Sequence, residues 1–254
     1  MTKKRLSAVV NVLDGLVVQS FGFNSYLPIG DPKYVLLNLD RWHVDEIILQ
    51  SISRSRKGLG PDFDLLHSIS DLQLSTPLIY GGGIRSPIDA DSVISLGADR
   101  IIVGNLLFSD PHQLSSIVNH VGKQAVIGSV PINSIVPFTP VDYVLNRTHH
   151  NFTFLSELLD SGLLSELLLI DYNSEGYSAN WKDLHSPMLP SFPVPLILFG
   201  GLTNPSDISN LLSLDIVSSV AIGNILSYKE HAYQTLKQSI DSSTLRPYIF
   251  SSVL

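Results

Sequence analysis

Short apolar runs alternate with amphipathic segments along the whole chain. The apolar runs predict eight strands, near residues 6–12, 45–50, 76–80, 100–104, 124–130, 165–171, 195–199 and 219–223. The segments that follow them predict helices, near residues 32–42, 62–72, 87–96, 111–120, 152–161, 180–187, 205–213 and 229–240. Near-continuous apolar strands such as 167–170 are typical of a parallel sheet buried on both faces. The strict alternation therefore predicts an α/β fold, a (β/α)8 TIM barrel.

Two stretches, 77–107 and 195–226, are similar to one another. Each contains an apolar strand, a glycine-rich loop, a helix opened by Ser-Pro or Asn-Pro, and a second strand that ends in Gly-Asn. The copies lie about half a chain apart, which predicts two fused (β/α)4 half-barrels. No segment is long or polar enough to divide domains, so we expect a single domain over 1–254. Residues 132–151 are a polar excursion between the fifth strand and the fifth helix.

The glycines of these copies follow the predicted strands, at the end of a barrel where ligands bind. Glycine lets the backbone approach an anion closely, and free N–H groups at a helix N-terminus bind one. We therefore predict phosphate-binding loops in both halves; the alternative is that the glycines only permit tight turns. The predicted phosphate-binding residues are Gly82, Gly83, Gly104, Asn105, Gly176, Gly200, Gly201, Gly223 and Asn224.

Composition removes several classes of function. The formal net charge is −7, whereas a nucleic-acid-binding surface is basic. There is no cysteine, and no apolar run is long enough to span a membrane. The adjacent pair His149 and His150 does not have the spacing of a metal site. We expect a cytoplasmic protein that binds neither nucleic acid nor membrane, and that carries no cofactor and no metal.

The whole chain resembles the cyclase subunit family of imidazole glycerol phosphate synthase. The resemblance rests on Arg5, Asp14-Gly15, Val17-Val18, Gly30-Asp31-Pro32, Val44-Asp45-Glu46, Gly81-Gly82-Gly83-Ile84, Gly97-Ala98-Asp99-Arg100, Gln124-Ala125-Val126 and Leu245-Arg246-Pro247. In that family a partner glutaminase makes ammonia, which crosses the barrel to a bisphosphate substrate. The resemblance therefore implies a class-I glutaminase partner and a phosphorylated small-molecule ligand.

The catalytic positions depart from the family pattern. The family uses two opposed aspartates, on strands 1 and 5, as general acid and base; Asn11 and Pro131 stand at these positions here. Neither side chain exchanges a proton near neutral pH, so the resemblance implies a degenerate cyclase centre. The acids that remain as candidates for catalysis are Asp14, Asp171 and Glu175.

The opposite end of the barrel keeps the family pattern. Arg5, Glu46, Arg100 and Glu166 match the four charged residues that ring the family's ammonia entrance. Asp99 and Gln124 match positions at its glutaminase interface. The resemblance implies a retained ammonia gate and a retained partner; the alternative is that polar residues at strand starts serve stability only.

The combination resembles a divergent branch of the family associated with sugar amidation in lipopolysaccharide and other surface-polysaccharide biosynthesis. On this interpretation the barrel passes ammonia toward a sugar amidotransferase. Two alternatives stay open. One is an active cyclase-lyase that forms imidazole glycerol phosphate in histidine biosynthesis. The other is a non-catalytic phosphosugar-binding protein.

Overall fold

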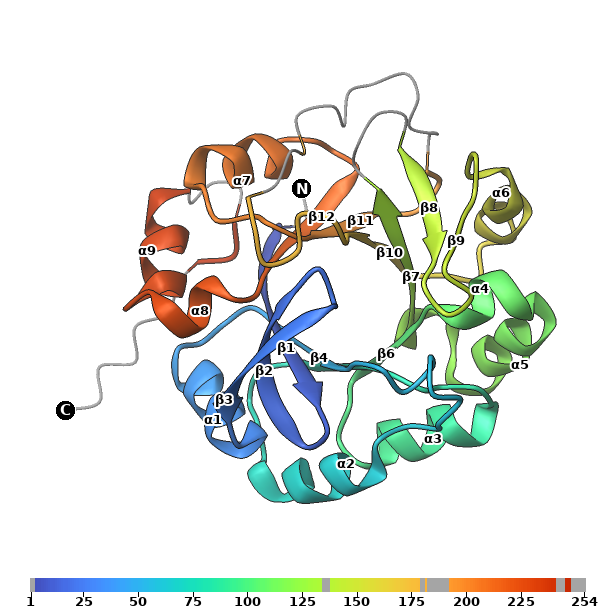
Figure 1. Ribbon diagram of the computed structural model, residues 1–254, viewed down its shortest axis with the longest axis horizontal. Helices are drawn as coiled ribbons and strands as arrows, with labels where there is room; N and C mark the ends of the chain where they lie inside the picture. Colours follow the sequence, from blue (N-terminus) through green and yellow to red (C-terminus); the bar gives the residue numbers. More distant parts are fainter. Residues whose placement is uncertain (1–2, 134–137, 179–180, 182–191, 241–244, 248–254) are drawn as a thin grey trace.

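Eight parallel strands form a closed barrel in the computed structural model, which describes residues 3–133, 138–178, 181, 192–240 and 245–247. Each strand pairs in parallel with the next, and the last pairs with the first (Figure 1). The barrel strands are β1 (Arg5–Leu13), β4 (Ile47–Ser51), β5 (Leu78–Gly81), β6 (Arg100–Val103), β7 (Val126–Asn133), β10 (Glu166–Asp171), β11 (Leu196–Phe199) and β12 (Val217–Ile222). The predicted (β/α)8 fold is confirmed.

Helices surround the barrel (Figure 1). They are α1 (Pro32–Arg41), α2 (Phe63–Ile69), α3 (Pro87–Ser95), α4 (Asn105–Ser109), α5 (Pro111–Val121), α6 (Thr153–Asp160), α7 (Pro205–Leu212), α8 (Ile225–Tyr228) and α9 (Ala232–Ser239), with short 3-10 turns at Ser70–Leu72 and Lys123–Ala125. Side-chain caps set several of the starts: Ser86 accepts from the backbone N–H of Asp89, and Asn204 accepts from that of Ser206. The helix predicted over 180–187 lies outside the described residues except for Trp181. None of the helices described is long and apolar enough to cross a membrane.

Two antiparallel excursions interrupt the simple alternation. After β1 the chain forms a hairpin from β2 (Leu16–Phe21) and β3 (Ser25–Gly30), which reaches over the middle of the barrel (Figure 1). After β7 the chain continues through β8 (Thr139–Asp142) and β9 (Arg147–Thr148), within the predicted polar excursion. Both leave from the carboxyl end of a barrel strand, so both lie at the ligand-binding end.

The alternation of side chains along each strand produces two cores. One fills the lumen and consists of Val9, Ile48, Ile79, Ile102, Ile127, Leu168, Ile170, Ile197, Phe199 and Ala221. The larger one lies between the strands and the helices. The register also decides which polar side chains point inward, because residues two apart on a strand share a face.

A buried ion pair attaches α9 to the amino end of the barrel. Lys237 bonds to Asp45, and the other carboxylate oxygen of Asp45 accepts the backbone N–H of Leu6 at 2.9 Å. The hydroxyl of Tyr233 donates to the carbonyl of Leu6 at 3.0 Å and accepts the backbone N–H of Asp45 at 2.8 Å. The charges of this pair are therefore compensated within the protein.

Candidate functional site

Four charged residues meet at the amino end of the barrel, which we call the floor quartet: Arg5, Glu46, Arg100 and Glu166. Arg5 lies 3.0 Å from Glu46 and 2.6 Å from Glu166, and Arg100 lies 2.6 Å from Glu166. The three ion pairs connect the quartet into one chain. Burial alone raises the pKa of Glu166, but the two arginines outweigh it and lower that pKa below the usual value.

The two residues predicted for a partner interface lie beside this quartet. Asp99 and Gln124 are both exposed, just before β6 and β7. The backbone carbonyl of Gln124 accepts from Arg100 at 3.2 Å. The Asp99 carboxylate accepts the backbone N–H of Leu78 at 2.8 Å, which joins the starts of β5 and β6. A partner at this end would therefore contact Asp99, which precedes Arg100 in the chain, and Gln124, which is hydrogen-bonded to Arg100.

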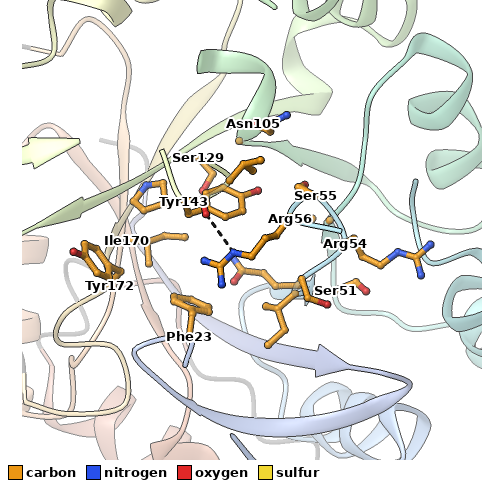
Figure 2. Close-up of a pocket in the computed structure, with 18 of the residues that line it drawn as sticks. Phe23, Ser51, Arg54, Ser55, Arg56, Asn105, Ser129, Tyr143, Ile170 and Tyr172 are labelled. Carbon is orange, nitrogen blue, oxygen red and sulfur yellow. Dashed lines mark hydrogen bonds between the residues drawn. The ribbon is translucent and has the colours of Figure 1, made fainter. Parts of the chain in front are cut away.

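A cavity of about 550 Å3 opens at the other end, over β4 to β7; we call it the first cavity. Its volume lies within the range of about 300–1,000 Å3 usual for small-molecule sites. Gly82, Gly83, Gly104 and Asn105, predicted to bind phosphate, all line it. The lining also includes Phe23, Arg54, Arg56, Tyr143 and Tyr172, which are labelled in Figure 2. Pro131 belongs to the same lining.

Sequence reasoning missed the arginines and the aromatic wall of the first cavity. Arg54 and Arg56 lie on the loop between β4 and α2, and Tyr143 lies on the turn between β8 and β9. A Cβ added to Gly104 would lie 3.7 Å from the Tyr143 ring, so the excursion after β7 covers the glycine loop. The basic run 54–57 is unusual in a chain of net charge −7, and it could have indicated that these arginines belong to a site.

The glycine loops also have a packing role. Gly82 has φ +134°, and a Cβ there would collide with the carbonyl oxygen of Ser51 at the end of β4. Gly200 has φ +120°, and a Cβ there would collide with the carbonyl oxygen of Asp171 at the end of β10. The two halves of the barrel thus use a glycine in the same way, to bring one strand end against its neighbour.

A second cavity of about 380 Å3 lies over β10 to β12. It brings together Gly176, Gly201, Gly223 and Asn224 from three separate segments, with Glu175 beside them. Gly200 directly precedes this lining and accepts the indole N–H of Trp181 at 2.9 Å through its carbonyl. The glycines of each half therefore gather around a cavity of their own.

Glu175 and Asn224 hold the β2–β3 hairpin down. The Glu175 carboxylate accepts from the Ser20 hydroxyl at 2.8 Å and from the backbone N–H of Phe23 at 3.2 Å. Asn224 bonds to both backbone groups of Ser20, at 2.6 and 3.2 Å. We call Ser20, Glu175 and Asn224 the hairpin latch. Burial raises the pKa of Glu175, and these hydrogen bonds only partly oppose that increase.

Asn11 and Pro131 are both buried, on β1 and β7. Asn11 alternates with Val9, so it is on the lumen-facing side of β1, and its amide oxygen has no hydrogen-bond partner in the described part of the chain. Pro131 lines the first cavity. Neither an amide nor a pyrrolidine ring can take or give a proton near neutral pH.

The candidate acids Asp14 and Asp171 lie away from the first cavity. Asp14 occupies the turn between β1 and β2 with φ +47°, and its exposed carboxylate pairs with Lys57 at 3.2 Å. Asp171 is fully buried and alternates with Leu169, on the side of β10 that faces the helices. One of its oxygens accepts the backbone N–H of Ser174 at 3.3 Å. The structure therefore does not gather the candidate acids Asp14, Asp171 and Glu175 into one group.

The parallel barrel, its ion-paired floor and the two glycine-lined cavities at its mouth define the class of protein, a (β/α)8 barrel with cavities of the size usual for small-molecule sites. The chain belongs to the family described as histidine biosynthesis protein, whose model matches residues 5–232.

Relatives cover nearly the whole chain at low identity. A protein of Leptospira interrogans named "Putative imidazole glycerol phosphate synthase subunit HisF" is 27% identical over 90% of this chain and 92% of its own length. The imidazole glycerol phosphate synthase subunit HisF of Oleidesulfovibrio alaskensis is 24% identical over 95% of this chain and 96% of its own length. The chain is thus a HisF-like member of the histidine biosynthesis family.

Proposed function

We propose that this chain is the barrel subunit of a glutamine amidotransferase complex and that its own cyclase centre is degenerate. Ammonia enters from a class-I glutaminase at the floor quartet, crosses the barrel and leaves at the mouth for amidation of a sugar. The observation that carries the proposal is the contrast between the two ends. The floor quartet is intact, whereas Asn11 and Pro131 occupy the two positions where the family has acids.

The floor supports the ammonia route because its charges are mutually paired. Its two arginines and two glutamates cancel, so the quartet is neutral as a group. Breaking a buried ion pair by removing one partner is strongly destabilising, which keeps the set together. Such a group blocks ions but offers hydrogen bonds to a small neutral molecule. The exposed neighbours Asp99 and Gln124 supply a surface on which a glutaminase can dock.

The mouth supports delivery rather than cyclisation. Proton transfer by a positioned acid or base typically contributes 10²–10⁴-fold to a rate, and both groups are missing here. Exposed apolar side chains lie on separate segments at this end of the barrel; they are Leu27, Ile29, Leu59, Leu145, Tyr177 and Tyr228. A protein docked on this end would cover them. We assign this end to a sugar amidotransferase, and the glycine-lined cavities to a phosphorylated ligand.

A second candidate is an active cyclase-lyase that forms imidazole glycerol phosphate. The names of the relatives favour it. It requires another proton-exchanging group in place of Asn11 and Pro131. Among the candidate acids, Glu175 fits this requirement best, because it is buried beside the second cavity and burial raises its pKa. Its carboxylate already binds the hairpin, however, which favours the delivery function.

The deciding experiment measures two activities of the purified protein. The first is ammonium-dependent turnover of the bisphosphate substrate of imidazole glycerol phosphate synthases; the second is stimulation of a class-I glutaminase when the two proteins are mixed. The proposal expects no turnover and a stimulated glutaminase. Turnover at the rate of an ordinary cyclase, abolished by Glu175→Gln, would establish the second candidate instead.

A matched pair of variants tests the docking face. Gln124→Arg alters the exposed residue next to the floor quartet, in the 3-10 turn that follows α5. Gln113→Arg makes the same exchange in the first turn of α5, at the end of the helix away from Gln124. We expect Gln124→Arg to reduce glutaminase stimulation and Gln113→Arg to leave it unchanged. Equal stimulation by both variants would place the partner elsewhere.

A further inference from the structure

The smallest lumen-facing side chains of the barrel follow one another along β12. Residues two apart on a strand share a face, and Ala221 belongs to the lumen core, so Ser219, Ala221 and Gly223 all face the lumen. The lumen core residues of the other strands are larger; they are Val9, Ile48, Ile79, Ile102, Ile127, Leu168, Ile170, Ile197 and Phe199. Side chains of β12 therefore fill little of the lumen where this strand meets β1, a line of contact that we call the seam.

Two buried serines lie at the start of the seam, beside the floor quartet. Ser7 follows Arg5 by two residues on β1, and its hydroxyl donates to the Glu46 carboxylate at 2.5 Å. The hydroxyl oxygens of Ser7 and Ser219 lie 2.5 Å apart. Because the Ser7 proton is directed at Glu46, Ser219 is the donor between the two hydroxyls. The Ser219 oxygen accepts no hydrogen bond from the described residues, so it can accept one from a small molecule.

This chain of hydroxyls has a direction, from Ser219 to Ser7 to Glu46. Hydrogen bonds in a chain polarise one another, so a hydroxyl that donates toward a carboxylate becomes a better acceptor. The molecule that fits beside Ser219 is therefore a small N–H or O–H donor. Ammonia meets this requirement as a neutral molecule, whereas ammonium would carry a charge into an apolar lumen, where its burial is costly.

The second cavity reaches the other end of the seam. Ala221 and Gly223 line it, and Ala221 is the strand partner of Ser7. The first cavity instead reaches lumen residues of β6 and β10, neither of which pairs with β1 or β12. The serines beside the floor quartet are therefore closer along the strands to the second cavity than to the first.

The Phe199 ring covers the seam between the serines and the second cavity. Phe199 is buried, lines that cavity and pairs with Ala221 on the side of β12 away from β1. A Cβ added to Gly223 would lie 3.2 Å from the Phe199 ring, so the ring occupies the space that the glycine leaves. Movement of this one side chain would open the seam to the cavity.

We propose that ammonia travels along the seam, from the floor quartet past Ser7 and Ser219 into the second cavity, and that Phe199 is the cover that opens to let it pass. Ser219 accepts a hydrogen bond from the ammonia on the way. This inference rests on the ammonia delivery of the proposed function, and it assigns the place where ammonia emerges. The acceptor of the ammonia then receives it at the second cavity.

A single cysteine introduced into the lumen reports access, because the chain contains none of its own. Ser219→Cys places the thiol at the seam, and Ile127→Cys is the control at matched depth. Ser219 is the strand partner of Arg5, and Ile127 is that of Glu166. The probe is methyl methanethiosulfonate, a small neutral thiol reagent, and mass spectrometry of the full chain follows its reaction. We expect Ser219→Cys to react faster by a factor on the order of 10, because Ile127→Cys requires a wider opening of the barrel.

Exchanges of Phe199 in both reporter variants test the cover. Phe199→Leu should accelerate the reaction of Ser219→Cys, again by a factor on the order of 10, and Phe199→Trp should slow it. Ile127→Cys should change little. Urea unfolding of each variant detects a global loss of stability, which would accelerate both reporters alike. Ser7→Cys is a second reporter at the seam, with the same expected order of rates, should Ser219→Cys not fold.

Equal rates at the two reporters, or a rate of Ser219→Cys that does not depend on Phe199, would overturn the inference. A bound glutaminase should leave the rate of Ser219→Cys unchanged, since the reagent enters from the second cavity; protection by the glutaminase would place the entry at the floor and contradict the cover. The rates on the isolated chain involve no glutaminase. Access along the seam without glutaminase stimulation would therefore remove ammonia as the molecule carried, which separates a failure of the proposed function from a failure of the route.

Discussion

Replacing Glu175 with alanine should release the β2–β3 hairpin while the barrel stays folded. The carboxylate accepts the Ser20 hydroxyl and the backbone N–H of Phe23. Two connections remain in the variant, the bond from the backbone N–H of Gly22 to the carbonyl of residue 175 and the bonds between Asn224 and Ser20. The hairpin is thus weakened at one of three attachments.

The size of the effect follows from the groups left behind. A buried donor without a partner costs about 1–3 kcal/mol, and two are affected here. Removing a carboxyl that is costly to bury offsets part of this, as the raised pKa of Glu175 indicates. We therefore expect a loss of about 1–3 kcal/mol in the free energy of hairpin opening, equivalent to roughly 5- to 150-fold more opening.

Amide hydrogen exchange of residues 20–23 measures this opening directly. Glu175→Gln is the control, since both hydrogen bonds end on one oxygen of the carboxylate and the amide oxygen of glutamine can accept both. Exchange should accelerate in Glu175→Ala at these residues, less so in Glu175→Gln, and not in β5 or β6. Unchanged exchange at the hairpin, or uniform acceleration throughout the barrel, would refute the latch.

The pH dependence of the latch has a definite sign. Because burial raises the folded-state pKa of Glu175 above the ordinary glutamate value of 4.5, its ionisation opposes folding. Its contribution to stability is therefore complete at pH below about 4.5 and declines as pH increases through the folded-state pKa. Glu175→Gln should remove this part of the pH profile. An identical profile in the variant would contradict the assignment.

Three further predictions concern stability. Glu166→Ala removes the acidic partner that Arg100 has among the described residues and one of the two acidic partners of Arg5, which still pairs with Glu46; it should cost about 3–5 kcal/mol in urea unfolding. Because the pKa of Glu166 is lowered, native stability from this group should be present above about pH 4.5 and lost as pH falls through the folded-state value. Lys237→Met strands the buried carboxylate of Asp45 and should cost a similar amount, whereas a loss below about 1 kcal/mol would contradict the pairing. Gly82→Ala should lower the melting temperature because of its φ of +134° and its clash, while Gly104→Ala, whose Cβ would make ordinary contacts, should not.

The two ends of the barrel differ in how far their geometry could be predicted. The floor quartet comes from the starts of strands, and strand positions follow from local apolar runs, so resemblance and pattern together located all four residues. The glycine clusters were predictable for the same reason, since they come directly after strands. The hairpin latch was not, because Ser20 and Glu175 lie far apart in the chain and meet only when the β2–β3 hairpin folds over the mouth.

The side of β10 on which Asp171 lies could not be predicted either. Asp171 ends a strand whose span was predicted correctly, yet a shift of one residue decides between lumen and helix layer. The pairing of β10 with β7 and β11 sets that register, and it turns Asp171 toward the helices.

The sequence by itself determined the alternation of strands and helices, the repeat of the two halves and the absence of a proton-exchanging side chain at Asn11 and Pro131. These features depend on residue type and on neighbours within a few positions. Only the tertiary structure decided that Glu175 binds the hairpin, that Tyr143 covers Gly104, and that Arg56 extends into the cavity without an acidic partner among the described residues. Each of these depends on contacts between loops distant in the chain, which form only once the closed barrel brings the ends of its strands together.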